Sequence, residues 1–303
     1  MSQKTLYPAI EAATQALAAY YDPVFERGCR KYGISLQSLF LLLAFPAFEP
    51  KPVNVETLNI RSPYTAAEHY HALLQEMMHV DMVASETEGQ YRITQHGMEV
   101  LKETLTAVYE VLGEIKSLPM TKQMDLASRL KMLTDACLTA PDPPGTWCIR
   151  HARRLDPGSR APMMARVDQF LSELQAFRDD AHLAAWRGIE SNGHAWDILT
   201  QLWRERGSNP EQIFQTLARR GNSLDQSHRA VELLLRRGWI TREATLLRIT
   251  SFGSEIRQNA ENATERYFHS PFEKISTVEM NETIALLEEF SRELSSQKAM
   301  SDE

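Results

Sequence analysis

The 303-residue sequence has little cysteine, glycine and proline, and it contains no long hydrophobic run. Its three cysteines (Cys29, Cys137 and Cys148) form no CxxC pair, which argues against a zinc ribbon or redox pair and favours free thiols in a reducing compartment. No apolar stretch approaches the ~20 residues that cross a bilayer, and no basic-then-apolar signal peptide opens the chain. These absences predict a cytoplasmic protein with no membrane partner.

Recognisable catalytic and cofactor motifs are also missing. There is no H-E-x-x-H, G-x-S-x-G, P-loop or Rossmann fingerprint. Among the nine histidines, His182 lies close to two carboxylates, those of Asp179 and Asp180. A helix cap plus a packed histidine is favoured for this group over a metal or acid–base site. The sequence therefore predicts a protein that is not an enzyme and that uses no metal or cofactor.

An internal repeat is the most informative feature that is present. Residues 73–98 and 230–254 share an apolar-striped helix, a short apolar segment, a polar tip, an R-I-T strand and a following x-x-Gly. The R-I-T-x-x-G element spans Arg92 to Gly97 in the first copy and Arg248 to Gly253 in the second. Because the same motif follows the same kind of helix twice, the repeat indicates a duplicated structural unit.

Each copy predicts a helix, a two-stranded hairpin and a second helix. Apolar residues at intervals of three and four mark the helices, and β-favouring residues flank the polar turns. Thr94 and Thr250 are placed to cap the helix after each hairpin. Shorter helices are expected upstream, at 36–45, 55–60 and 65–78 in the first copy, and at 195–206, from Pro210 and from Ser223 in the second. This order is the winged-helix plan.

The predicted fold class is mainly α-helical with small β-hairpin wings, arranged as two winged-helix units joined by a helical connector. The expected domains are an N-terminal winged-helix unit over 1–118, a helical connector over 119–178, and a C-terminal winged-helix unit with a terminal helix over 179–303. No sheet of four or more strands is expected.

Several segments also match the pattern of known proteins. They include D-D-A-H-L-A-A-W at 179–186, L-L-L-R-R-G-W-I at 233–240, R-Y-F-H-S-P-F at 266–272 and R-S-P-Y-T-A at 61–66. These segments resemble bacterial winged helix-turn-helix proteins of the broad MarR-like type, in an uncharacterised branch. The resemblance covers most of the chain and its motifs are mainly structural. It implies a DNA-binding transcription regulator; the alternative is a winged-helix protein-interaction or assembly module that does not bind DNA.

Charge separates the two copies. The whole chain has a net charge of −7, which counts against indiscriminate nucleic-acid binding. Residues 51–102 carry four cations and seven acids, a balance of −3, whereas residues 203–257 carry ten arginines and six acids, a balance of +4. Because phosphate contacts need cations or hydrogen-bond donors, double-stranded DNA is expected to bind the second copy alone.

The third helix and the hairpin of the second copy supply the candidate DNA-binding residues. Leu224, Val231, Leu234 and Leu235 are expected to face inward, which leaves polar and basic side chains outward. The candidates are Arg219, Arg220, Ser223, Gln226, Ser227, Arg229, Arg242 and Arg248. The competing interpretation is a solvated basic face that neutralises nearby acids, with the serines and glutamine acting as helix caps.

The segment after the Pro-rich break at 142–145 is a candidate site for a small-molecule effector, although core packing is the favoured interpretation. Trp147, Arg150 and Arg153 combine an aromatic ring with guanidinium groups, which suits an anionic aromatic ligand. The alternative is that Trp147 packs in the connector core and the arginines form salt bridges.

Apolar stripes on the terminal helices suggest how these helices pair, either between two chains or within one chain. The first is formed by Ile10, Ala13, Leu17 and Tyr20, and the second by Met280, Ile284, Leu287 and Leu294. Such stripes must be buried, since each buried Leu or Ile contributes ~1.5–3 kcal/mol. The resemblance to MarR-like proteins implies a homodimer formed through these helices. The alternative is that they close onto each other within one chain as a pseudo-dimer.

Overall fold

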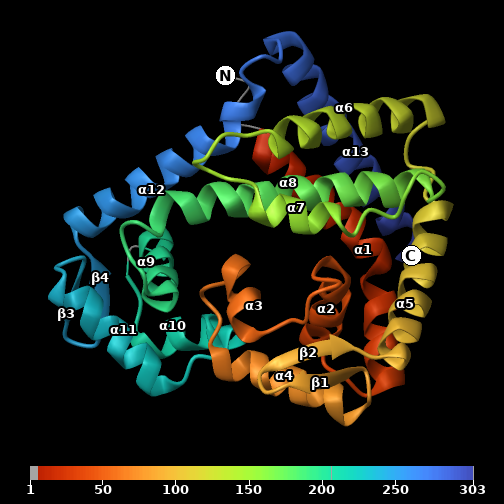
Figure 1. Ribbon diagram of the computed structural model, residues 1–303. Helices are drawn as coiled ribbons and strands as arrows, with labels where there is room; N and C mark the ends of the chain where they lie inside the picture. The colour runs from red at the N-terminus through yellow and green to blue at the C-terminus, as the bar shows by residue number, and fades with distance from the viewer. Residues whose placement is uncertain (1–5, 206, 303) are drawn as a thin grey trace.

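Helices make up most of the fold, and the strands form two short hairpins (Figure 1). The computed structural model describes residues 6–205 and 207–302. Within them each hairpin is a separate two-stranded antiparallel sheet. The predicted fold class, mainly α-helical with two small β-hairpins, is confirmed, and the arrangement is consistent with winged helices.

The first hairpin belongs to a group of elements that we call the N-terminal set (α2–α5). Val53, just before α3, forms an isolated antiparallel β-bridge with Tyr91 of the hairpin. The elements are α2 (Leu36–Ala44), the 3-10 turn η2 (Phe45–Ala47), α3 (Val55–Arg61), α4 (Ala67–His79), β1 (Val83–Thr87), β2 (Gln90–Ile93) and α5 (Gln95–Glu114).

The second hairpin belongs to the C-terminal set (α9–α12), which has the same order of α-helices and strands. Ser208 bridges to Leu247 as Val53 does to Tyr91 in the first set. The elements are α9 (Gly193–Glu205), α10 (Pro210–Thr216), the 3-10 turn η3 (Ala218–Arg220), α11 (Leu224–Arg236), β3 (Ile240–Glu243), β4 (Leu246–Ile249) and α12 (Ser251–His269).

The predicted helix caps are present. The Thr94 and Thr250 hydroxyls accept hydrogen bonds from the backbone N–H three residues on, at 2.9 Å and 3.0 Å. Asn209 caps α10 and Ser223 caps α11 in the same way. Each cap satisfies an amide that the first helical turn leaves free, which explains why the helices begin at these positions.

The repeated glycine after each hairpin has a steric cause. A Cβ on Gly97 would lie 2.1 Å from the carbonyl oxygen of Met82, and one on Gly253 would lie 2.1 Å from that of Trp239. Any larger residue would push the long helix away from the hairpin. The R-I-T-x-x-G repeat therefore records the same close contact between helix and hairpin in both sets.

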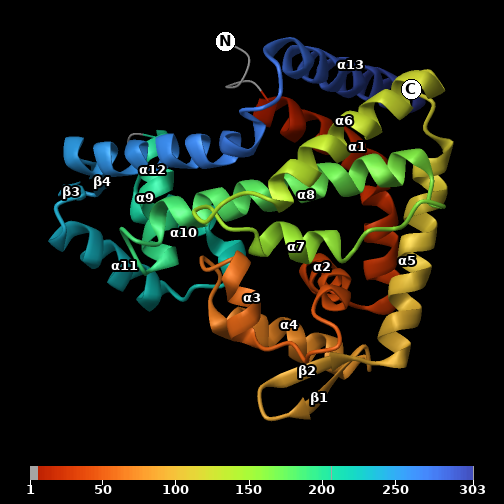
Figure 2. The ribbon, with the colours of Figure 1, turned by 45° about the horizontal axis from the view of Figure 1, so that its top comes forward.

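The remaining helices form the scaffold that carries the two sets. Helix α1 packs along α13, and α8 packs against α6, α7 and α12 (Figures 1 and 2). Each helix that precedes a set therefore pairs with the helix that follows the other set. The bounds are α1 (Leu6–Tyr32), α6 (Met120–Leu138), α7 (Trp147–Arg153), α8 (Met163–Trp186), the 3-10 turn η4 (Ser270–Phe272) and α13 (Thr277–Asp302).

The apolar stripes of the terminal helices are covered within the chain. Ile10, Leu17, Leu287 and Leu294 are fully buried, and the Tyr20 hydroxyl donates to the Leu294 carbonyl at 2.8 Å. Ala13, Met280 and Ile284 are also buried, and Tyr20 is half-buried. The faces expected to pair two chains are thus occupied intramolecularly, which supports the pseudo-dimer alternative.

Three local expectations need correction. Leu224 does not face inward but is 61% exposed, because the buried face of α11 begins only at Ser227. The apolar stripe of the sequence predicts a first helix over 7–21, but α1 continues through Pro23 to Tyr32. The β-favouring residues at 80–84 predict a strand that begins at Val80, but β1 begins at Val83, because Asp81 adopts a left-handed turn (φ 56°) before it.

Cys137 and Cys148 are buried thiols, Cys29 is half-buried, and all three are free. Among the helices that the structure describes, none is long and apolar enough to span a membrane.

Candidate nucleic-acid interface and central cavity

The polar candidates at the start of α11 are engaged in local structure. Ser223 and Gln226 form a capping box, in which the Ser223 hydroxyl accepts from the Gln226 amide at 3.1 Å and the Gln226 side chain accepts from the Ser223 amide at 2.7 Å. Ser227 is 3% exposed and its hydroxyl lies 2.9 Å from Nε2 of His194. These three side chains therefore shape and anchor the first turn of α11.

Arg220 is a candidate that the structure places inside the molecule. Its guanidinium forms an ion pair with Asp197 at 3.0 Å and lies over the ring of Tyr64, 5.0 Å from the ring centroid. It also donates to the Ser62 hydroxyl at 3.4 Å. Because Ser62 and Tyr64 precede α4, Arg220 ties the C-terminal set to the N-terminal set.

The two sets meet along residues 62–69 and 219–226, which we call the junction. The Ala66 amide donates to the Arg220 carbonyl at 2.9 Å, and the Asn222 side chain donates to the Tyr64 carbonyl at 2.9 Å. The Gln226 side chain of α11 also donates to the Glu68 carboxylate of α4 at 3.5 Å, so the first turns of the two helices are in contact. Two-fold related recognition helices enter major grooves about 34 Å apart. Helices α4 and α11 of one chain therefore cannot occupy successive grooves.

Beyond the junction, one side of helix α11 presents cations to solvent. Arg229, Glu232 and Arg236 are spaced by three and four residues, so they share one side of the helix. Arg242 of β3 reaches the same side through an ion pair with Glu232 at 3.1 Å. We call Arg229, Arg236 and Arg242, all exposed, the arginine stripe.

Two more exposed arginines flank the stripe. Arg219 lies in η3 beside the junction, and Arg248 of β4 pairs with Glu243 at 2.7 Å. Among the described residues, the side chains of Arg219 and Arg236 form no ion pair. Arg236 was not among the residues expected from the sequence. Its spacing of seven from Arg229 on a helix is the signal that could have identified it.

The N-terminal set carries exposed acids on the corresponding helix and hairpin, and it has Ala72, His79 and Ser85 where the arginine stripe has Arg229, Arg236 and Arg242. Glu68 of α4 and Glu86 and Glu88 of the hairpin are exposed. Arg92 is paired with Glu86 at 2.8 Å and with Glu49 at 3.4 Å. The asymmetry expected from the sequence therefore extends to the exposed surfaces of the two sets.

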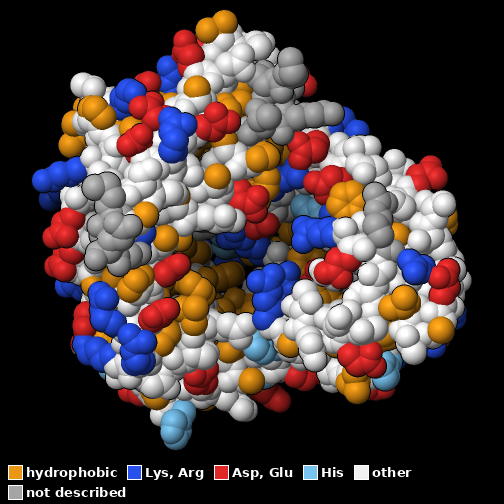
Figure 3. All heavy atoms as spheres, turned by 180° about the vertical axis from the view of Figure 1, so that it is seen from behind, with side chains coloured by type: hydrophobic (Ala, Val, Ile, Leu, Met, Phe, Trp, Pro, Cys, Tyr) orange, Lys and Arg blue, Asp and Glu red, His pale blue; other side chains and the backbone are white. Residues whose placement is uncertain are grey.

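A cavity of about 700 Å³ lies between the N-terminal set and the connector helices α7 and α8. Seen from behind, the molecule is hollowed near its centre, with hydrophobic and basic side chains at the wall (Figure 3). Trp147 lines the cavity, stacked on His151 with ring centroids 3.8 Å apart. Arg150 and Arg153, expected to accompany Trp147 in an effector site, are not among the lining residues.

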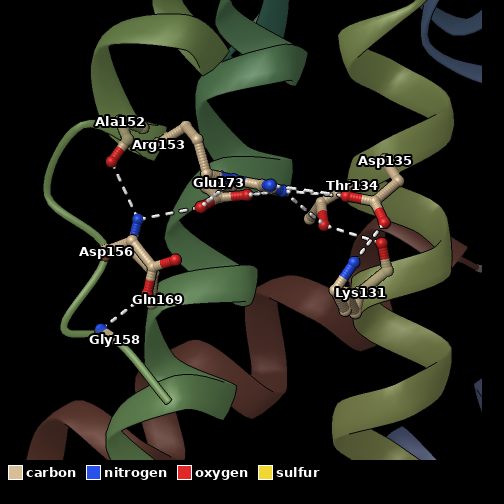
Figure 4. A network of polar contacts seen from close by, with 9 residues as sticks. All are labelled: Lys131, Thr134, Asp135, Ala152, Arg153, Asp156, Gly158, Gln169 and Glu173. Carbon is tan, nitrogen blue, oxygen red and sulfur yellow. Dashed lines mark hydrogen bonds and ion pairs between the residues drawn. The ribbon is translucent and has the colours of Figure 1, made fainter. Parts of the chain in front are cut away.

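Both of these arginines are held elsewhere. Arg153 binds the fully buried carboxylate of Glu173 at 2.7 Å and that of Asp135 at 3.3 Å, so it links α7 to α8 and α6 (Figure 4). Arg150 donates to the Leu138 carbonyl at 3.1 Å. The salt-bridge alternative therefore describes Arg153, and the cations that line the cavity are Arg61 and Arg220.

The acidic pair next to His182 has two structural roles. Asp179 forms an ion pair with Arg61 at 2.7 Å, and burial raises the pKa of Asp179 while Arg61 opposes that shift. Asp180 accepts from two backbone N–H groups in the first turn of α7, at 2.8 Å and 3.0 Å. Burial lowers the pKa of His182 to about 4. Among the described side chains, no group of three His, Cys, Asp or Glu could hold a metal ion.

The fold and this surface define a helical protein with two hairpins, of which one carries an exposed cluster of arginines. The model of the Helix-turn-helix family matches residues 76–301, and the chain belongs to that family. The match contains the whole C-terminal set and begins near the end of α4. No curated protein and no solved structure gives a significant match.

Proposed function

We propose that the protein is a cytoplasmic transcription regulator that binds double-stranded DNA through its C-terminal set. Membership of the helix-turn-helix family suggests DNA binding. The proposal keeps two winged-helix units, at 1–118 and 179–303, joined by a connector over 119–178. The observation that carries it is the arginine stripe along α11 and β3. The N-terminal set has no arginine at the equivalent positions and carries exposed acids on α4 and its hairpin.

The ion pairs of the arginine stripe leave it free to bind phosphate. The Arg229–Asp225 and Arg242–Glu232 pairs are exposed, with about half or more of each side chain accessible. Exposed pairs contribute only ~0–1 kcal/mol, so a DNA phosphate can replace the carboxylate at little cost. Arginine also suits phosphate because it donates two parallel hydrogen bonds.

The junction alters the expected set of contacts. Because Arg220, Gln226 and Ser227 are engaged within the molecule, we assign the contacts to the arginine stripe with Arg219 and Arg248 at its flanks. One chain then offers one basic surface, so as a monomer it would bind an asymmetric DNA site rather than a palindrome.

The test compares two triple variants that remove the same charge. R229A/R236A/R242A deletes the arginine stripe, while R27A/R30A/R160A removes three exposed arginines outside the C-terminal set. Both are assayed by gel shift on duplexes selected from a random-sequence pool by the wild-type protein. We expect the stripe variant to lose at least tenfold in affinity and the control less than twofold. Equal losses would contradict the assignment.

The alternative is a protein-interaction or assembly module that does not bind DNA. The observation that favours it is the junction, where the first turn of α11 is occupied by the chain itself. In that case the wild-type protein would select no duplex from the pool. Control by a small-molecule effector is part of the main proposal, and the cavity lined by Trp147 provides the room for one.

A further inference from the structure

The two walls of the central cavity differ in chemistry. One wall is formed by one side of α8, where polar side chains are spaced three or four residues apart: Gln169, Ser172, Gln175 and Asp179. The facing wall, from α2, η2, α3, the start of the junction and α4, is mostly aromatic and aliphatic, and its aromatic rings are those of Phe40, Phe48, Tyr64 and Tyr70. Trp147 of α7, which packs beside α8, adds a further ring. The volume of about 700 Å³ falls in the range of ~300–1,000 Å³ that is typical of small-molecule sites.

Hydrogen-bonding groups on the polar wall are free to serve a ligand. The side chains of Ser172 and Gln175 form no hydrogen bond to the described residues, although both face the cavity. Gln169, by contrast, donates to the Ala152 carbonyl at 2.8 Å. A ligand with donors or acceptors along one edge would therefore find partners in the middle of this wall.

The charges that line the cavity are already balanced. Arg61 pairs with Asp179 at 2.7 Å, and Arg220 pairs with Asp197 at 3.0 Å. The Arg220–Asp197 pair is mostly buried, so an anionic ligand that took Arg220 would leave the Asp197 carboxylate unpaired inside the molecule, which is unfavourable. The half-exposed Arg61–Asp179 pair adds no net charge to the lining. The lining therefore disfavours the anionic ligand expected from Arg150 and Arg153.

We propose that the central cavity binds an uncharged, planar aromatic molecule, with its rings against Trp147 and the facing aromatic wall and its hydrogen-bonding edge on Ser172 and Gln175. Arg220 and Tyr64 line the cavity and also hold the junction, so an occupant contacts the same side chains that fix the first turn of α11. Any effect of the ligand on DNA rests on the proposed function; binding in the cavity does not.

The test uses two fluorescent probes with the same ring system. N-phenyl-1-naphthylamine is uncharged, and 8-anilinonaphthalene-1-sulfonate adds a sulfonate. Both emit more strongly in apolar surroundings, and each is titrated into the full-length protein without DNA. We expect the uncharged probe to bind at least tenfold more tightly. Equal or tighter binding of the sulfonate would overturn the assignment of ligand charge, and no binding of either would overturn the site.

Matched variants locate the bound probe. S172W fills the cavity, whereas S128W places the same side chain at an exposed position of α6. We expect S172W to weaken binding of the uncharged probe at least tenfold and S128W less than twofold. If S172W does not fold, as judged by circular dichroism and Tm, W147L replaces it and should weaken binding at least threefold. Wild-type affinity in the folded cavity variant would overturn the proposal.

Because these readouts contain no DNA, they separate the two proposals. If the arginine-stripe variant loses DNA and S172W loses the probe, both proposals stand. A protein that selects no DNA yet binds the uncharged probe in the cavity retains the ligand site and loses only the regulatory role.

Discussion

A pair of glycine substitutions tests whether the junction is closed in solution. Gly221 and Gly238 both have left-handed backbones, with φ of +66° and +67°. A Cβ on Gly221 would lie 2.4 Å from Cβ of His69 at the junction, whereas one on Gly238 meets nothing within 4 Å. G221A therefore combines backbone strain with a clash across the junction, and G238A introduces the backbone strain alone.

The expected magnitudes follow from these contacts. An L-residue in the left-handed region costs roughly 1–2 kcal/mol, so G238A should lower the free energy of unfolding by about that amount. Overpacking adds roughly 1–3 kcal/mol, because the His69 Cβ is fixed to the backbone of α4 and cannot rotate away. G221A should thus lose about 2–5 kcal/mol in total.

Urea unfolding followed by circular dichroism measures both losses. H69G removes the clashing atom, so the double variant G221A/H69G should lose less than the sum of its single changes. If G221A and G238A lose the same stability, and H69G gives no rescue, the first turns of α4 and α11 are not in contact in solution, and the reasoning about the junction is refuted.

Three further predictions concern the scaffold. R153A should cost about 3–5 kcal/mol because it strands the buried Glu173 carboxylate, while the double variant R153M/E173L should recover most of that loss; a single-variant loss below about 1 kcal/mol in urea would contradict this. Burial raises the pKa of Asp168 to about 6, although a hydrogen bond from Tyr21 opposes the shift. Because this folded-state pKa exceeds the unfolded value, ionising Asp168 is less favourable in the folded protein than in the unfolded chain. The contribution of Asp168 to the free energy of unfolding is therefore fully present below pH ~4 and is lost as the pH rises through about 6. D168N should therefore stabilise the protein by roughly 1–3 kcal/mol at pH 7.5 and hardly at all at pH 4; an equal gain at both pH values would count against a titration effect. D180A should free two amides of α7 and cost about 1–3 kcal/mol, with faster hydrogen exchange at Cys148 and Ile149; unchanged exchange there would argue against the cap.

Features that depend on local spacing could be predicted from the sequence. The caps at Thr94 and Thr250, the hairpins and the buried stripes of the terminal helices all involve residues within a few positions of one another. The greater positive charge of the second copy was equally visible. Each of these follows from helix and strand periodicity or from composition, which needs no knowledge of the tertiary contacts.

The junction and the cavity could not be predicted in this way. Arg220 had all the local features of a DNA contact, yet its partners Tyr64 and Ser62 lie about 160 residues earlier in the chain. Trp147 was expected in a ligand site and does line the cavity, but the buried Glu173 of α8 holds Arg153 away from it. A carboxylate or an aromatic ring on another element of the fold determines where each of these arginine side chains points.

The salt dependence of DNA binding tests the central claim most directly. Binding of a selected duplex is measured by fluorescence anisotropy between low and moderate salt, for the wild type and for R229A/R236A/R242A. If the five arginines on α11, its flanks and the hairpin contact phosphates, log K should fall with log salt at a slope of roughly −3 to −5. The stripe variant should flatten that slope by about 3. Failure of the wild type to bind any selected duplex at low salt, or a slope that the variant leaves unchanged, would contradict DNA binding through the arginine stripe.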